Sequence, residues 1–128
     1  MSIFFDYDLS YPGPAFPIVE ITITSESGQK VNGQVALVDT GADATIIPLN
    51  LLKSINARRV DTKFARNVDG SRYMVRLFSV TIDIGPYIVH GIDAIANENT
   101  PEIILGRDAL NQLVVNLDGI AQVTNIDN

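Results

Sequence analysis

Residues 36–45 read ALVDTGADAT and bring an acidic side chain to the end of a short apolar run. The apolar residues predict the last part of a buried strand, and Asp39 follows them directly. A carboxylate in such a place loses hydration, so it needs hydrogen-bond donors close by. Gly41 lets the chain turn sharply and directs backbone N–H groups toward the carboxylate, while the hydroxyl of Thr40 can bond to neighbouring backbone and hold the turn. The stretch therefore predicts a fixed, partly desolvated carboxyl group at the apex of a loop.

Two further features lie downstream of this loop. Residues 103–108 read IILGRD, a second apolar run that leads into a short predicted helix. Between the two runs, Asp69 and Gly70 stand among residues of high β propensity, which is the sequence pattern of a hairpin. An Asp-Thr-Gly tripeptide alone is a weak signal, because an Asp often closes a turn after a strand. The three features together, in this order, are more specific than the tripeptide.

The remainder of the chain consists mostly of short β-rich segments, which indicates a single, mainly β domain over residues 1–128. The predicted strands are residues 17–24, 31–38, 72–84 and 87–96, with two more between residues 114 and 125. One short helix is predicted from Pro48 through Ile55 and another from Arg107 to about Leu113. Residues 1–16 contain prolines and are expected to form an extended arm, and residues 114–128 supply C-terminal strands and a tail.

ALVDTGADAT followed by IILGRDAL resembles the retropepsin-like aspartic proteases, which are single-lobe relatives of pepsin. The resemblance covers roughly residues 17–119, which is most of the chain. It implies a closed, mainly β acid-protease barrel with a flap hairpin and one or two short helices. It also implies that Asp39 is the catalytic aspartate, that Thr40 forms a hydrogen-bonded lock between subunits, and that Gly41 faces the substrate backbone.

By the same resemblance, Ala42 and Asp43 contact the substrate, and Asp43 forms a structural ion pair with Arg107. The flap tip that closes over the peptide corresponds to Val68, Asp69, Gly70 and Ser71. This chain departs from the compact viral members in three ways. Ala44 stands where some of them carry a second acid, the flap tip has a single glycine, and both chain ends are longer. Because paired chain ends build much of the viral dimer interface, the form of the interface here is left open.

Aspartic-protease chemistry needs two carboxyl groups that share one proton around a single water, as the aspartic proteases themselves exemplify. The chain holds a single Asp-Thr-Gly motif. We therefore expect a homodimer in which Asp39 meets its own copy across a two-fold axis. The expected substrate is an extended protein or peptide that is cut at internal bonds.

Two other functions fit parts of the pattern. A catalytically silent module with the same fold, used for dimerisation or peptide binding, would lack the chemistry, since a fold does not determine a function. A metal site or phosphatase on Asp39 and Asp43 is disfavoured, because the spacing is not Asp-x-Asp and the chain has one histidine and no cysteine. The silent module stays open as an alternative.

The overall charge and composition narrow the expected partners and the cell compartment. Fifteen acidic residues against nine basic ones leave a net charge of −6, which disfavours binding to nucleic acid. The basic residues scattered between Lys53 and Arg66 are interpreted as a solvated face. No apolar run approaches the ~20 residues that span a bilayer, and residues 1–15 lack the features of a secretory signal. No cofactor, metal or membrane partner is therefore expected, and the expected location is cytoplasmic.

Overall fold

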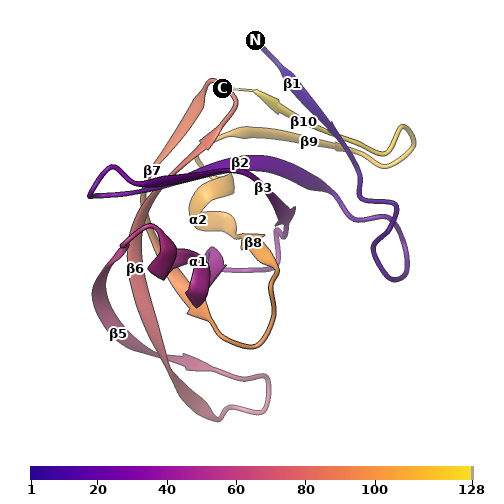
Figure 1. Cartoon of the computed structure of the whole chain (residues 1–128). Helices are drawn as coiled ribbons and strands as arrows, with labels where there is room; N and C mark the ends of the chain where they lie inside the picture. Colours follow the sequence, from indigo (N-terminus) through magenta and orange to yellow (C-terminus); the bar gives the residue numbers. More distant parts are fainter. Residues whose placement is uncertain (128) are drawn as a thin grey trace.

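The computed structural model describes residues 1–127, which form two β-sheets and two short helices (Figure 1). The larger sheet contains β2 (Ile18–Ser25), β3 (Lys30–Val38), β4 (Ile46–Pro48), β5 (Arg58–Arg66), β6 (Arg72–Ile84), β7 (Tyr87–Asn97) and β8 (Ile103–Leu105). The smaller sheet contains β1 (Ile3–Asp6), β9 (Val114–Asp118) and β10 (Val123–Asp127). The helices are α1 (Leu49–Ser54) and α2 (Arg107–Leu110). Residue 128, the last of the expected C-terminal tail, lies outside the described residues.

The larger sheet closes on itself. Its strands follow the order β2-β3-β8-β4-β7-β6-β5, and an additional antiparallel pairing between β2 and β6 joins β2 to the far part of this order. Six strands therefore form a closed barrel, while β5 lies outside the ring and pairs with β6. Closure gives each strand of the ring a neighbour on both sides, which removes free edges from the ring. The expected closed, mainly β barrel is confirmed.

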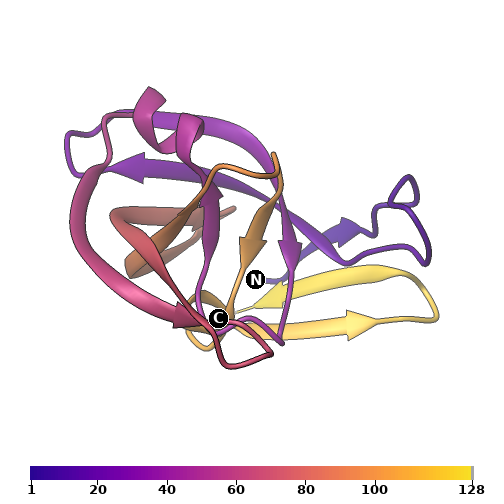
Figure 2. The ribbon, with the colours of Figure 1, turned by 90° about the horizontal axis from the view of Figure 1, so that it is seen from below.

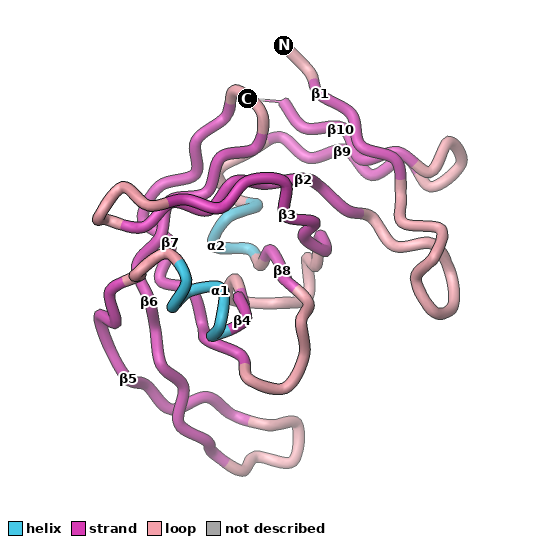
Figure 3. Tube along the Cα trace, in the orientation of Figure 1, coloured by secondary structure: helices cyan, strands magenta, loops and turns pink. Residues whose placement is uncertain are grey.

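Alternating apolar residues fill the interior of the barrel. Val19, Ile21 and Ile23 of β2 are buried, whereas the residues between them are more exposed, as expected for a strand with one face in a core. The other strands of the ring contribute mainly branched aliphatic side chains to the same cluster. Figure 3 shows the two helices beside the short strands β4 and β8, and each helix buries two apolar residues against the barrel.

Most predicted elements are confirmed, and the differences concern short segments. β6 has the predicted bounds, and β2, β3 and β7 lie within a few residues of theirs. β5, at nine residues, was expected only as one arm of the hairpin around Asp69 and Gly70. α2 ends at Leu110 instead of near Leu113, because the chain continues in tighter turns in which Leu113 N–H bonds to the carbonyl of Leu110. The arm of residues 1–16 contains β1, which pairs with β10. The sequence pattern does not predict β1 or β4, because three or four residues carry too little alternation.

The pairing of β3 with β8 positions the candidate site. These strands lie side by side and parallel, with Ala36 opposite Ile103 and Val38 opposite Leu105. Parallel strands present their C-terminal ends at the same edge of a sheet, so the residues that follow Val38 and Leu105 meet there. The connection between the two strands contains the β5–β6 hairpin, whose tip lies on the same side of the barrel as the loop after β3 (Figure 2).

Candidate active site

The loop that follows β3 holds the carboxylate of Asp39 in place. The Asp39 N–H donates to the carbonyl of Leu105 at 3.1 Å, which extends the β3–β8 pairing by one residue. Ala42 N–H donates back to the Asp39 carbonyl at 3.2 Å and closes the turn. Oδ1 of Asp39 accepts a hydrogen bond from Gly41 N–H at 2.9 Å, and Oδ2 makes no hydrogen bond within residues 1–127. The side chain is half-buried, so one oxygen is fixed by the turn and the other remains available to a water or a second acid.

Gly41 and Thr40 occupy the apex of this loop. A Cβ atom at position 41 would lie 3.2 Å from Oδ1 of Asp39, which is closer than an ordinary van der Waals contact. Glycine therefore lets the backbone donate to the carboxylate without crowding it. Thr40 is exposed, and its hydroxyl makes no hydrogen bond within the described part of the chain. This hydroxyl is available to a group outside the chain.

Arg107 ties the loop to the start of α2. Its backbone N–H donates to the carbonyl of Ala42 at 2.9 Å, and its Nη1 donates to the carbonyl of Thr40 at 2.8 Å. Its Nη2 forms an ion pair with the carboxylate of Asp43. The side chains of Arg107 and Asp43 are 46% and 89% exposed, and an exposed ion pair adds little stability. Arg107 thus mainly positions the loop, because its planar guanidinium contacts the loop at two points.

A buried cluster behind the loop joins the two sequence motifs. Thr45 is fully buried, and Asp108 accepts hydrogen bonds from its N–H at 3.0 Å and from its hydroxyl at 2.8 Å. The same hydroxyl accepts a bond from Gly106 N–H at 3.3 Å. A Cβ atom at position 106 would lie 2.5 Å from the carbonyl carbon of Ala44, so the two backbones pass too closely for any side chain there. This contact and these bonds hold the loop that bears Asp39 against the start of α2.

The flap tip is a turn that its own side chains hold. Asn67 N–H donates to the carbonyl of Ser71 at 2.8 Å, and Gly70 adopts φ +88°, which favours glycine. Oδ1 of Asp69 accepts bonds from the Ser71 hydroxyl at 2.6 Å and from the Ser71 N–H at 2.8 Å. These two bonds lower the pKa of the Asp69 carboxyl. Val68 is fully exposed at the end of the turn. The tip is therefore ordered by polar contacts in spite of its single glycine.

A pocket of about 490 Å³ lies between the flap hairpin and the barrel. Its lining includes Tyr73 and Val75 from β6, Ile46 from β4 and Ile95 from β7. β6 pairs with β7 only from Leu77 onward, so the part of β6 nearer the flap tip lacks a β7 partner beside this pocket. The pocket is mixed apolar and polar and has a size typical of ligand sites.

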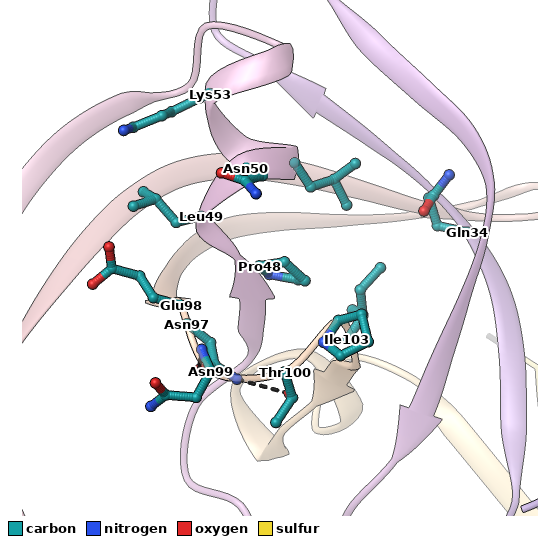
Figure 4. Close-up of a pocket in the computed structure, with 12 residues that line it drawn as sticks. Gln34, Pro48, Leu49, Asn50, Lys53, Asn97, Glu98, Asn99, Thr100 and Ile103 are labelled. Atoms are coloured by element: carbon teal, nitrogen blue, oxygen red, sulfur yellow. Dashed lines mark hydrogen bonds between the residues drawn. The ribbon is translucent and has the colours of Figure 1, made fainter.

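A second pocket, of about 680 Å³, lies between α1, β3 and the segment that leads into β8 (Figure 4). In Figure 4, Gln34 lies on one side of this pocket and Lys53 and Glu98 lie on the other. None of the lining residues belongs to the loop that bears Asp39. Gln34 and Ile103 lie toward the N-terminal parts of their parallel strands, whereas Asp39 follows the C-terminal end of β3. The pocket is therefore separate from the Asp39 site.

Neither a metal-binding cluster nor a membrane-spanning helix is found among the described residues. No group of three His, Asp or Glu side chains within residues 1–127 is arranged to hold a metal ion. In that same part of the chain, none of the helices has the length and apolar character needed to cross a bilayer.

The structure places Asp39, Thr40, Gly41, Ala42 and Asp43 in one loop that Arg107 braces. The predicted flap residues 68–71 form the tip of the β5–β6 hairpin. Within residues 1–127, no hydrogen bond or ion pair joins this tip to the loop that bears Asp39.

The sequence did not predict the buried bonds between Thr45 and Asp108 or the close approach of Gly106 to Ala44. The bonded partners are 63 residues apart, so no local pattern connects them. The local signal that could have indicated them is Asp108, an acid in the first turn of a helix that follows Gly106.

Comparison with known proteins agrees with this geometry. A family model described as "gag-polyprotein putative aspartyl protease" matches residues 27–112, which include β3, the loop that bears Asp39, the β5–β6 hairpin and α2. The crystal structure of a retropepsin-like aspartic protease from Rickettsia conorii is similar, with a TM-score of 0.66 at 13% sequence identity, over 98% of this chain and 90% of that one. At such low identity the likeness concerns the fold. The search among curated proteins found no match. The chain therefore belongs to the gag-polyprotein aspartyl protease family and has the retropepsin-like fold.

Proposed function

We propose that this chain is an aspartic endopeptidase that acts as a homodimer on extended protein or peptide substrates. The observation that carries the proposal is the state of the Asp39 carboxylate. Its Oδ1 is held by Gly41 N–H in a braced loop, and its Oδ2 has no partner within residues 1–127. A second carboxyl group from another copy would complete the pair that the chemistry needs.

In the proposed reaction, the two Asp39 side chains share one proton and hold a water between them, since two close carboxylates do not both ionise easily. The ionised group takes a proton from the water as the water oxygen bonds to the peptide carbonyl carbon. The protonated group donates a hydrogen bond to the carbonyl oxygen. The dyad then gives a proton to the amide nitrogen and takes one back from a hydroxyl of the tetrahedral intermediate as the C–N bond breaks. The products are an amine and a carboxylic acid, and the dyad is restored.

The remaining predicted site residues receive supporting roles in this proposal. The exposed Thr40 hydroxyl would bond across the two-fold axis and lock the two loops together. Gly41, Ala42 and Asp43 would contact the substrate main chain, and residues 68–71 would close over it. The pocket between the flap and the barrel has room for a substrate side chain and presents Ile46 and Val75 to it.

The smaller sheet supports a specific place for the second copy. β10 is already paired on both sides, with β1 and with β9 of its own chain, so its edges are not available to a partner. The other edge of β9 has no strand beside it in the described chain. An edge strand readily pairs with its own copy in antiparallel fashion across a two-fold axis. β1 is the other outer strand of this sheet, but it lies beside β2 of its own chain. We therefore place β9 against β9 of the second copy.

This placement can be tested with a charge at the β9 edge. Antiparallel self-pairing over residues 114–118 puts Val114 beside Asp118 of the other copy. Val114→Glu then sets like charges opposite each other, and dimer affinity should fall roughly 3- to 30-fold in sedimentation measurements. Ile88→Glu, at a similarly exposed apolar residue of the barrel, is the matched control and should leave dimerisation intact. Equal dimer affinities for both variants would contradict the placement.

The reaction itself is tested by incubating the protein with a library of denatured proteins at several pH values. Wild type should produce internal cuts that disappear in Asp39→Asn and that a statine-type transition-state mimic blocks. Asp93→Asn changes the same amount of charge at an exposed position of β7 and should retain the cuts. A wild type that dimerises and binds peptides but cuts none of them would instead indicate the silent module.

A further inference from the structure

The basic residues of the chain are concentrated on the flap hairpin. Residues 58–76 contain six basic and two acidic side chains, which is a net charge of +4. The rest of the chain contains three basic and thirteen acidic side chains, which is a net charge of −10. A basic hairpin thus extends from an acidic body. Such a separation of charge attracts an anionic partner to one element and repels it from the remainder.

One face of this hairpin carries the arginines. The antiparallel register sets Arg66 opposite Arg72, Phe64 opposite Met74, and Thr62 opposite Arg76. We call these six residues the outer flap face. Cross-strand partners share a face, and the opposite face includes the buried Val75 and Leu77. Phe64 and Met74 are 63% and 64% exposed, and Met74 also lines the pocket between the flap hairpin and the barrel, so the outer flap face borders that pocket.

The contacts within this face leave arginine donors free. Arg76 forms an ion pair with Glu98 at 3.2 Å, and no carboxylate lies within ion-pair distance of Arg66 or Arg72 in residues 1–127. The guanidinium of Arg72 lies over the ring of Phe64, 4.9 Å from its centroid. Stacking orients a guanidinium and leaves its planar edge open to a carboxylate. Like charges directly opposite in a ladder oppose pairing, and an anion bound between Arg66 and Arg72 would relieve that repulsion.

Protection of a sheet edge explains only part of this charge. β5 is the outermost strand, and lysine or arginine on an edge strand prevents pairing with other chains. Arg72 and Arg76, however, lie on β6, which has β5 beside it. Exposed Phe64 and Met74 between the arginines would moreover weaken such protection. The face has the character of a binding surface with cationic ends and an apolar centre.

We propose that the outer flap face binds an acidic segment of the substrate polypeptide, next to the part held in the cleft. This inference rests on the proposed peptidase function, because it is the flap that would meet the substrate. A short acidic segment can reach the flap alone, whereas a long nucleic acid would also meet the acidic body. The face would therefore select protein substrates with Glu or Asp on one side of the cut.

The test uses two fluorescein-labelled peptides with the same eight-residue core of alternating leucine and serine. One carries four glutamates at its end and the other carries four glutamines. Binding to the full-length Asp39→Asn protein is followed by anisotropy at 50 and 300 mM NaCl. The glutamate peptide should bind roughly 3- to 20-fold more tightly at low salt, and the difference should shrink at high salt. Arg66→Gln/Arg72→Gln should abolish the difference, and Lys30→Gln/Lys53→Gln, with the same charge change elsewhere, should keep it.

Three results would overturn the proposal. They are equal binding of the two peptides, an unchanged difference in the arginine variant, and tighter binding of a single-stranded oligonucleotide that matches the glutamate peptide in charge. Cleavage by the wild type separates this proposal from the function on which it rests. If both peptides are cut at equal rates by an Asp39-dependent activity, only the acidic preference is refuted. If the glutamate peptide binds through the arginines but neither it nor the denatured-protein library is cut, the peptidase function is refuted.

Discussion

Substitution of Gly106 by alanine probes the contact that joins the two motifs. The backbone at Gly106 has φ −91° and ψ −176°, a conformation that alanine adopts without strain, so any cost comes from packing. The added Cβ would lie 2.5, 2.6 and 2.9 Å from the C, O and N atoms of Ala44. Carbon atoms in contact prefer 3.5–4.0 Å, so the two backbones must separate by about 1 Å.

Overpacking of this kind costs about 1–3 kcal/mol, and the weakened hydrogen bond from Gly106 N–H to Thr45 adds about 1 kcal/mol. We therefore expect Gly106→Ala to lower the free energy of unfolding by about 2–4 kcal/mol. That loss is a large fraction of the ~5–15 kcal/mol of a typical domain. The urea midpoint should fall by about 1–2 M, since the slope for small proteins is about 1–3 kcal/mol per molar.

Gly119→Ala is the matched control for this substitution. No atom lies within 4 Å of a Cβ at position 119, and Gly119 has no left-handed φ. Its unfolding midpoint should stay unchanged or rise slightly, because alanine restricts the unfolded chain. Both variants are compared at one protein concentration, since dimerisation links stability to concentration. A Gly106→Ala protein as stable as the control would refute the argument that the close approach to Ala44 locks the loop.

Three further substitutions test other contacts of the structure. Thr45→Val keeps the shape of a fully buried side chain but removes its hydroxyl, and the unpaired groups should cost about 1–3 kcal/mol in urea unfolding. Arg107→Lys removes the planar guanidinium that contacts the loop bearing Asp39 at two points, so kcat/KM on any cleaved peptide should fall more than tenfold. The unfolding free energy should change by less than about 1 kcal/mol, because the ion pair is exposed. An unchanged rate would contradict the bracing role. The hydrogen bond from Arg58 lowers the pKa of Glu26 from 4.5 to about 2, so this pair contributes stability above pH 4.5 that is lost as the pH falls toward 2. The melting temperature of wild type should therefore exceed that of Glu26→Gln near pH 6, and the two should converge by pH 2.

Two sets of contacts hold the loop that bears Asp39, and they differ in how much they add to the stability of the fold. The ion pair between Asp43 and Arg107 is exposed and adds little to folding, but it fixes the loop that bears Asp39. The bonds between Thr45 and Asp108 are buried, and they support both the stability of the fold and the position of the loop. Positioning residues of the first kind should alter rates without altering stability, and those of the second kind should alter both.

Much of the barrel could be predicted because its strands are long and alternate clearly. β6, with thirteen residues, has its predicted bounds, and the β2–β3 hairpin follows its predicted segments closely. The family was also identified correctly from residues 36–45 and 103–108, because two separated motifs in the right order are far more specific than one. The short strands β1 and β4 were missed, because three or four residues hold too few alternations to stand out. The bounds of β5 were not predicted either, although a hairpin around Asp69 and Gly70 was.

The amino-acid sequence by itself determined the mainly β fold, the family and the position of Asp39 at the end of an apolar strand. Only the tertiary structure decided that β2 closes the ring onto β6, that β10 is paired on both sides, and that Thr45 and Gly106 lock the two motifs together. The physical reason is the separation along the chain over which each interaction acts. Strand propensity and turn chemistry act between neighbours along the chain, whereas ring closure, edge occupancy and buried hydrogen bonds depend on residues that packing alone brings together.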